Sequence, residues 1–136
     1  MSDNPMNANA MIETPLMRGL ERVLDQSTLR HQILSTNIAN VDTPRYRTRD
    51  LPTFAGQIEQ AMAESGDEAS PGTALLTPVA REVRGLIERP DGNNVSVERE
   101  SLLLAQNQLR FEVAVAFLKS EFHNLSMAIN GGMSTS

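Results

Sequence analysis

The sequence predicts a mainly α-helical protein whose two long terminal helices pair as an antiparallel coiled coil, joined by an irregular middle segment. Proline and glycine end or weaken helices. Both are absent from residues 20–43 and 93–130 but frequent in residues 44–92. Apolar residues recur at intervals of three and four along both uninterrupted stretches, which is the spacing of one helix face. At 136 residues, the chain is long enough for one domain.

We expect the first helix to span residues 14–43, preceded by a disordered segment, residues 1–13, that shows no periodicity. Thr14 suits the N-cap, and Pro15 suits the first helical position because its missing N–H is not needed there. The residue before Pro44 is driven out of the α region, which ends the helix. The apolar face of this helix comprises Leu16, Leu20, Val23, Leu24, Leu34, Ile38 and Val41.

The second helix is expected over residues 95–130. Ser96 is its candidate N-cap, and Glu98 and Glu100 place negative charge at the positive end of the helix dipole. Gly131-Gly132 is expected to end it. One apolar stripe has heptad spacing and is predicted to form an intramolecular seam with the first helix. The residues assigned to this intramolecular seam are Leu104, Phe111, Val115, Leu118, Phe122 and Leu125.

A second apolar stripe lies on the opposite side of this helix, about 160° from the first at 100° per residue. A helix that is apolar on two opposed faces needs a partner on each. The first helix covers one face, and the middle of the chain has too few apolar residues to cover the other. We therefore predict that neighbouring subunits cover it and that the isolated chain is poorly ordered. The residues assigned to this subunit interface are Leu102, Leu109, Val113 and Ala116.

The middle segment, residues 44–94, offers weaker patterns. Residues 54–63 are compatible with a short amphipathic helix, and residues 65–73 have the composition of a flexible loop. Residues 79–87 alternate weakly between apolar and polar side chains, which favours a short strand. We therefore expect an irregular segment that contains short helical and β elements.

No catalytic, cofactor-binding or metal site is predicted, and no small-molecule substrate is expected. The chain has no cysteine, and its two histidines, His31 and His123, lie in different helices with no carboxylate four residues later. The sequence contains neither a Gly-x-Ser-x-Gly nucleophile elbow nor a glycine-rich loop that opens a helix to bind phosphate.

Charge and hydropathy exclude two further classes of protein. The 12 basic and 17 acidic residues give a net charge of -5, which argues against a nucleic-acid binder. The basic cluster Arg45, Arg47 and Arg49 around Tyr46 is better explained as an extended strand that pairs with carboxylates of an adjacent chain. No stretch approaches the ~20 apolar residues of a membrane span, and the N-terminus does not resemble a secretory signal peptide. Neither membrane insertion nor a cleaved signal is therefore expected.

Two runs of sequence carry a resemblance to a known family. The run Asn37-Ile38-Ala39-Asn40-Val41-Asp42-Thr43-Pro44-Arg45-Tyr46 resembles the signature of flagellar rod, hook and hook-filament proteins. That signature is Asn-Ile-Ala-Asn, two variable residues, then Thr-Pro-Gly-Tyr. The run Asp91-Gly92-Asn93-Asn94-Val95, with Glu100 and residues 104–111, resembles the B-type proximal rod proteins of that family. Arg45 departs from the signature, because the family usually has glycine at this position. If relatives adopt a positive φ here, arginine is costly, and the local turn of this chain is then expected to differ.

The resemblance implies a structural subunit of the bacterial flagellar basal-body rod. Proteins of this family pair their terminal helices and stack around a central channel as a tubular driveshaft that transmits torque. The implied partners are copies of the chain itself, other proximal rod subunits, the basal-body adaptor FliE and the flagellar type III export apparatus. The implied location is the rod in the periplasmic space, reached without a cleaved signal peptide. The resemblance implies no enzymatic activity and no cofactor.

Two alternatives stay open on the sequence. A cytoplasmic helical adaptor or export chaperone has the same two-helix plan and acidity, but it is expected to be a stable dimer with no exit route. Within the family, the C-type proximal rod protein is the nearest competitor. The run Asp91-Gly92-Asn93-Asn94-Val95 favours the B-type.

Overall fold

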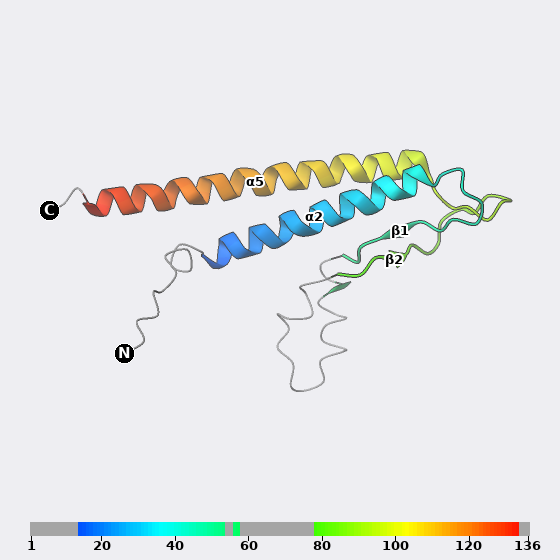
Figure 1. Ribbon diagram of the computed structural model, residues 1–136, viewed down its shortest axis with the longest axis horizontal. Helices are drawn as coiled ribbons and strands as arrows, with labels where there is room; N and C mark the ends of the chain where they lie inside the picture. Colours follow the sequence, from blue (N-terminus) through cyan, green and yellow to red (C-terminus); the bar gives the residue numbers. More distant parts are fainter. Residues whose placement is uncertain (1–13, 54–55, 58–77, 134–136) are drawn as a thin grey trace, which may run out of the picture.

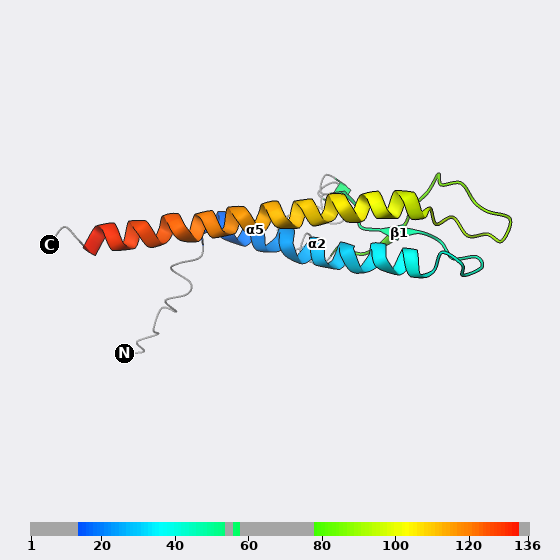
Figure 2. The same cartoon turned by 90° about the horizontal axis from the view of Figure 1, so that it is seen from above.

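The computed structural model describes residues 14–53, 56–57 and 78–133, and it is dominated by two long antiparallel helices (Figure 1). In chain order the elements are α2 (Pro15–Ala39), β1 (Arg49–Asp50), β2 (Arg81–Glu82) and α5 (Val97–Met133). The two helices lie side by side in both views (Figures 1 and 2). We call the end of the pair where α2 ends and α5 begins the closed end, and β1 lies beside α2 near it. The predicted fold class, two paired terminal helices with short β elements between them, is confirmed.

Helix α2 begins where the sequence predicts and ends earlier. The Thr14 side chain accepts a hydrogen bond from the Met17 backbone N–H at 3.1 Å, as an N-cap does. The helix ends at Ala39 rather than at residue 43, because Asn40 caps it. The Asn40 backbone and side-chain amides both donate to the Thr36 carbonyl, at 3.1 and 2.8 Å, and so satisfy a carbonyl that the helix leaves open.

Helix α5 begins with the expected cap and runs past its expected end. The Ser96 hydroxyl accepts a hydrogen bond from the Arg99 backbone N–H at 3.3 Å. The prediction that Gly131-Gly132 ends the helix is wrong, since α5 continues to Met133. A glycine terminates a helix by adopting the left-handed conformation. Of the described glycines, only Gly85 and Gly92 have a positive φ, so residues 131 and 132 continue the helix.

The middle of the chain contributes a two-stranded antiparallel sheet. Arg49 pairs with Glu82 and Asp50 with Arg81, so each pair places opposite charges across the strands. The expectation of a short strand within residues 79–87 is confirmed for Arg81–Glu82 alone. The expected helix over 54–63 lies outside the described residues except for positions 56 and 57, which are helical, and the segments 1–13 and 65–73 lie outside them entirely.

The core between α2 and α5 is thin and unusually polar. Of the described hydrophobic residues, the buried ones are Met17, Leu34, Val95 and Ala114. Leu16 and Val23, which the sequence placed on the inner face of the first helix, are exposed, and Met17 is buried instead. The buried polar residues are Ser27, Asn37, Thr48, Gln57, Asn93, Asn94, Glu100 and Asn107. Polar contacts therefore determine how the helices pair.

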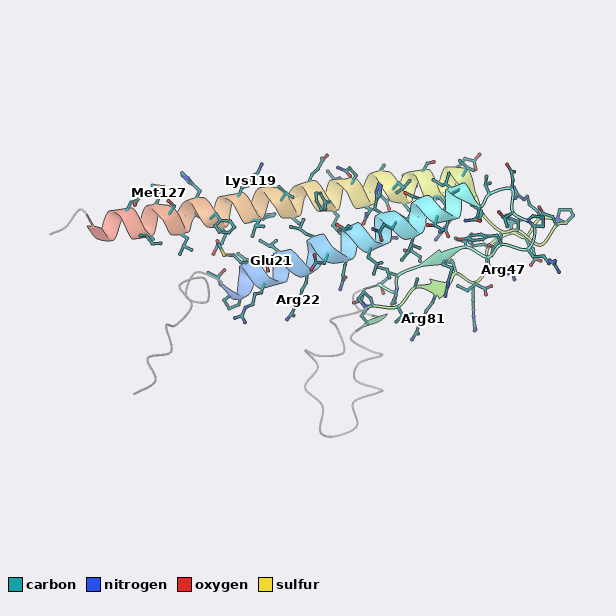
Figure 3. All side chains as sticks on the ribbon, in the orientation of Figure 1. Glu21, Arg22, Arg47, Arg81, Lys119 and Met127 are labelled. Atoms are coloured by element: carbon teal, nitrogen blue, oxygen red, sulfur yellow. The ribbon has the colours of Figure 1, made fainter. Side chains whose placement is uncertain are left out.

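The two helices differ in length, so one end of α5 has no helical partner from α2. Helix α5 has 37 residues and α2 has 25. The Thr14 hydroxyl donates to Glu121 Oε1 at 3.5 Å, which marks where α2 begins against α5. Residues 122–133, which we call the tip, project beyond that point (Figure 1), and Met127 is labelled on this projecting part in Figure 3. The closed end and the tip therefore have different surroundings.

Candidate functional site

The two motif runs, about fifty residues apart in the sequence, meet at the closed end of the helix pair. Asn37 is fully buried and lies at the centre of this contact. Its Nδ2 donates to the Arg49 carbonyl at 2.7 Å and to Glu100 Oε2 at 2.8 Å. Its Oδ1 accepts from the Tyr46 hydroxyl at 3.1 Å and from the Arg49 backbone N–H at 3.2 Å. One side chain thus joins α2, β1 and α5, and all four of its hydrogen-bonding positions are used.

Asn93 extends this contact to the segment that follows α2. Its Nδ2 lies within 3.0 Å of the carbonyl oxygens of Asn40 and Val41 and within 2.8 Å of that of Thr43. Its Oδ1 accepts from the Val95 backbone N–H at 2.8 Å. The second motif run therefore holds the backbone carbonyls of the turn that follows α2.

Asn94 holds the segment after α2 through contacts with Thr48. Its Oδ1 accepts from the backbone N–H of buried Thr48 at 2.7 Å, and its carbonyl accepts from the Thr48 hydroxyl at 3.2 Å. We call Asn37, Tyr46, Asn93, Asn94 and Glu100 the polar hub. It brings together motif residues that the sequence identified only as two separate runs.

The turn beside the polar hub shows why its glycine and arginine matter. Arg45 has a φ of 61°, the only positive φ at a non-glycine residue in the described part of the chain. Its backbone N–H donates to the Asp91 carbonyl at 2.9 Å. Gly92 has a φ of +82°, and a Cβ built there lies 3.2 Å from Arg45 Cγ. Gly92 is therefore needed for both its backbone conformation and the close approach of Arg45.

Charged groups around the polar hub are paired within the chain. Glu100 is fully buried, its Oε1 accepts from Arg99 Nη1 at 2.6 Å, and its Oε2 accepts from Asn37 Nδ2 at 2.8 Å. Arg30 binds Asp50 through two hydrogen bonds of 2.8 and 2.7 Å, and this hydrogen bonding raises the pKa of Arg30. Burial raises the pKa of the Tyr46 phenol, which favours its neutral, donating form.

Arg47 corrects one expectation. Its guanidinium binds Glu82 at 3.1 Å and Glu88 at 2.7 Å, and both carboxylates belong to the same chain. These hydrogen bonds raise the pKa of Arg47. The prediction that the arginine cluster pairs with carboxylates of an adjacent chain is therefore wrong for Arg47.

A row of α5 residues at seven-residue intervals faces α2. Glu100, Asn107 and Ala114 are buried, and Glu121 is half-buried. Asn107 Nδ2 donates to the Ser27 carbonyl at 2.7 Å, between the Glu100 contact at one end and the Glu121 contact at the other. Because each polar residue has one matching partner on α2, this row sets the register of the helix pair.

The apolar residues assigned from the sequence lie on either side of that row or away from it. The half-buried ones are Leu104, Phe111, Val115, Leu118 and Leu125. Phe122 is 51% exposed, because it lies beyond the start of α2 and so adds little to the intramolecular seam of the described chain. The residues assigned to the subunit interface, Leu102, Leu109, Val113 and Ala116, are all exposed.

Part of this exposed face lines a groove between the two helices. Leu109, Val113 and Phe117 of α5 face Leu20 and Val23 of α2 across it, and the groove has a volume of about 410 Å³. Gln106, Arg110 and Ala114 complete its lining. Leu109 and Val113 are 62% and 45% exposed. An apolar groove of this kind suits a packing partner rather than a polar substrate.

The two histidines and the acidic side chains of the described residues do not come together as a metal site. His31 and His123 are both exposed and lie on different helices. Within the described part of the chain, no three histidine, aspartate or glutamate side chains gather in a way that could hold a metal ion. Neither long helix has a described stretch apolar and long enough to cross a membrane.

Comparison with known proteins agrees with this arrangement. No protein-family model matches the chain. The flagellar basal body rod protein FlgB of Salmonella typhimurium is 28% identical over 130 residues, which cover 85% of this chain and 94% of that protein. FlgB of Escherichia coli and FlgB of Bacillus subtilis match with the same identity and coverage. The chain is therefore similar to FlgB proteins over most of its length, which indicates a structural subunit of the bacterial flagellar basal body rod.

The similarity to FlgB proteins confirms the resemblance that the two motif runs carry, and the structure shows the contact that joins them. Asn37 and Asn93 were identified as motif residues from the sequence, but their shared environment was not. The seven-residue row was missed, because Glu100 was interpreted as a helix-start charge and Asn107 breaks the apolar pattern. The strict spacing of 100, 107, 114 and 121 is the signal that identifies it.

Proposed function

We propose that this FlgB-like chain is a subunit of the proximal rod that transmits torque by packing rather than by catalysis. The observation that carries the proposal is the exposed apolar face of α5, on which Leu109 and Val113 are 62% and 45% exposed. Burying such residues against neighbours removes apolar surface from water, at about 25 cal/mol per Å². Interdigitated side chains resist shear, which a driveshaft requires.

The polar hub and the seven-residue row of α5 support the same proposal from inside the subunit. A subunit that transmits torque must keep its helices from sliding along each other. The polar contacts of Asn37, Asn107 and Glu121 fix one register, because a shift by one residue leaves buried polar groups unpaired.

We further propose that the partners are copies of this chain, other proximal rod subunits and the adaptor FliE, and that the flagellar type III apparatus exports it. On this proposal the chain reaches the periplasm without a cleaved signal peptide and works there as a purely structural protein. The absence of cysteine suits an oxidising compartment as well as a reducing one.

Replacement of Val113 by aspartate tests the proposal. The Val113→Asp chain is expected to be exported but not incorporated into rods, because burial of an unpaired carboxylate at the interface is costly. Export is measured by immunoblotting of the periplasmic fraction, and incorporation by its presence in isolated basal bodies.

Ala105→Asp is the matched control, since Ala105 is exposed on the same helix and does not line the groove. Normal swimming of the Val113→Asp strain contradicts the role of this face. Recovery of the unmodified chain as a soluble cytoplasmic dimer, absent from basal bodies, favours a helical adaptor or export chaperone instead.

A further inference from the structure

The small sheet has a free backbone edge on the side of β2 that faces away from the helices. In Figure 1, β1 lies between α2 and β2, so β2 forms the outer side of the sheet. The Arg49 backbone N–H and carbonyl both bind Asn37 and therefore point toward α2 rather than toward β2. Arg49 thus belongs to a non-hydrogen-bonded pair, and the backbone groups of its partner Glu82 point away from β1.

The same edge includes Arg84. The Val83 backbone N–H donates to the Thr48 carbonyl at 2.9 Å, so the backbone groups of Val83 point toward β1 and those of Arg84 point outward again. No hydrogen bond within the described chain uses the backbone of Arg84. Gly85 has a φ of +79° and bends the chain after it. We call the outward side of residues 82–84 the outer edge.

The sheet carries more arginines than the nearby carboxylates neutralise. Residues 45–53 and 78–91 contain six arginines and four acidic residues. Each of the four carboxylates is already in an ion pair, Asp50 with Arg30, Glu82 and Glu88 with Arg47, and Asp91 with Arg89. Within the described chain, exposed arginines without an ion pair therefore remain at positions 45, 49, 81 and 84. This positive surplus is local, because the whole chain has a net charge of -5.

We propose that the outer edge binds an extended, acidic segment of a partner protein, which adds as a third strand beside β2. The outward backbone groups of Glu82 and Arg84 supply the main-chain hydrogen bonds. The unpaired arginines bind the carboxylates of the added strand through charge-assisted hydrogen bonds, and Figure 3 labels one of them, Arg81, on β2. Val79 and Ile87 lie on either side of this edge, are 70% and 93% exposed, and supply apolar contacts.

The charge of the outer edge selects this occupant over a second copy of the chain. A second copy brings the same unpaired arginines to the contact, and like charges across an interface repel. An acidic strand instead neutralises them. The outer edge shares no residue with the groove between the helices, so a partner bound here leaves the apolar face of α5 free. The inference thus goes beyond the proposed rod function and names a second interface.

Photo-cross-linking in cells tests the proposal. Val79 and Ile87 are replaced, one at a time, by the photoreactive residue benzoylphenylalanine, the cells are irradiated, and the cross-linked peptide is identified by mass spectrometry. We expect an adduct with a different protein, at a segment in which aspartate and glutamate outnumber lysine and arginine. Recovery of the chain in isolated basal bodies is measured separately and reports on the proposed rod function.

Charge reversal separates a specific contact from chance proximity. Arg81→Glu/Arg84→Glu reverses two of the unpaired arginines and is expected to reduce the adduct at least about tenfold. Arg18→Glu/Arg22→Glu is the matched control, because it changes the net charge by the same amount at exposed positions of α2. The control should keep the adduct within about twofold of the unmodified chain.

Removal of one backbone donor tests strand addition itself. Proline has no N–H, and at position 82 it removes an outward donor without removing a hydrogen bond to β1. Glu82→Pro should reduce the adduct at least about fivefold relative to Glu82→Gln, which loses the same carboxylate but keeps the N–H. Circular dichroism of the purified variants checks that their helices are intact. If Glu82→Pro does not fold, Arg84→Pro is compared with Arg84→Gln in the same way.

The outcomes decide the two proposals separately. An adduct with an acidic segment of another protein supports strand addition if both the charge reversal and the proline substitution reduce it. Absence of an adduct, an adduct within one chain or between two copies, or an adduct that survives either change overturns it. Absence of the unmodified chain from basal bodies contradicts the proposed rod function, and the adduct still decides this inference.

Discussion

At the closed end of the helix pair, polar side chains are buried and almost all hydrogen-bonded, whereas at the opposite end the tip of α5 exposes apolar side chains. Asn37 and Glu100 are fully buried in the polar hub, and each has its partners within the chain. Phe122 and Ile129, by contrast, are half exposed with no charged residue among their helical neighbours in the tip. Polar groups are thus buried at one end and apolar groups are exposed at the other, which is the opposite of their usual distribution.

This difference separates two tasks. The hydrogen bonds of the polar hub form only in one register of α2 against α5. The polar hub therefore holds the two helices in one arrangement. Apolar contact is non-directional, so the tip and the groove can bind a neighbour whose approach the chain itself does not determine. We propose that folding is concentrated at the closed end and association at the tip and the groove. The following predictions test this division, beginning with the largest expected effect.

Asn37→Ala should destabilise the closed end by about 3 kcal/mol or more. It removes four buried or part-buried hydrogen bonds and leaves groups of Glu100, Tyr46 and the Arg49 backbone without partners, each worth about 1 kcal/mol or more. The measurement is amide hydrogen exchange along α2, in which protection is expected to fall. Asn40→Ala is the matched control, because it loses only half-buried contacts and should cost about 1 kcal/mol. Equal losses in the two variants contradict a special role for Asn37.

Tyr46 should make stability fall in strong alkali. Burial raises the pKa of its phenol above the unfolded value of about 10. Its stabilising effect is therefore complete below about pH 10 and is lost as the pH rises through the higher folded value. Urea unfolding followed by helical circular dichroism measures the effect, and Tyr46 is the only tyrosine, so phenolate absorbance reports it alone.

Tyr46→Phe provides the control for this titration. The variant should lose about 1 kcal/mol at neutral pH, because it no longer donates to Asn37 Oδ1. It should also lose the part of the alkaline decline that belongs to Tyr46. An unchanged decline in Tyr46→Phe means that another group controls it.

Hydrophobic periodicity found both helices, because each has an apolar face and includes most of a long stretch, residues 20–43 or 93–130, without proline or glycine. It did not identify the contact surface between them. Glu100 and Asn107 are buried through partners that lie far away in the sequence, Asn37 and Ser27, and no local pattern shows such a pairing. Caps, by contrast, were predictable because their contacts are local. Thr14 binds a backbone group three residues away, so its role depends on local sequence alone.

The ends of the helices show where local reasoning fails. Proline at position 44 predicts an end near residue 43, but the competing cap at Asn40 stops α2 at Ala39. Gly131-Gly132 predicts an end at residue 130, but both residues stay helical. A glycine permits the left-handed conformation without requiring it. Whether a glycine ends a helix therefore depends on its tertiary contacts, which local sequence does not show.

Arg45→Gly should stabilise the closed end by about 1 kcal/mol. Arg45 has a φ of 61°, a conformation that costs a non-glycine residue about 1–2 kcal/mol and costs glycine almost nothing. The greater freedom of glycine in the unfolded chain offsets part of the gain. Urea unfolding measures the change. Gly92→Ala should act in the opposite direction, since it adds a Cβ at a φ of +82°, 3.2 Å from Arg45 Cγ. A loss of stability in Arg45→Gly shows that the arginine side chain contributes more than its backbone strain costs.

Ile129→Ser should change the stability of the isolated chain by less than about 0.5 kcal/mol, because Ile129 is 51% exposed there. Leu34→Ala is the comparison at the closed end, where Leu34 is fully buried, and it should cost about 2–5 kcal/mol. In cells, Ile129→Ser should nevertheless give few assembled rods, although the isolated variant is about as stable as the unmodified chain. The amount of the chain in isolated basal bodies measures assembly. If Ile129→Ser destabilises the isolated chain as much as Leu34→Ala does, the tip belongs to the folding core, and the division between folding and association is wrong.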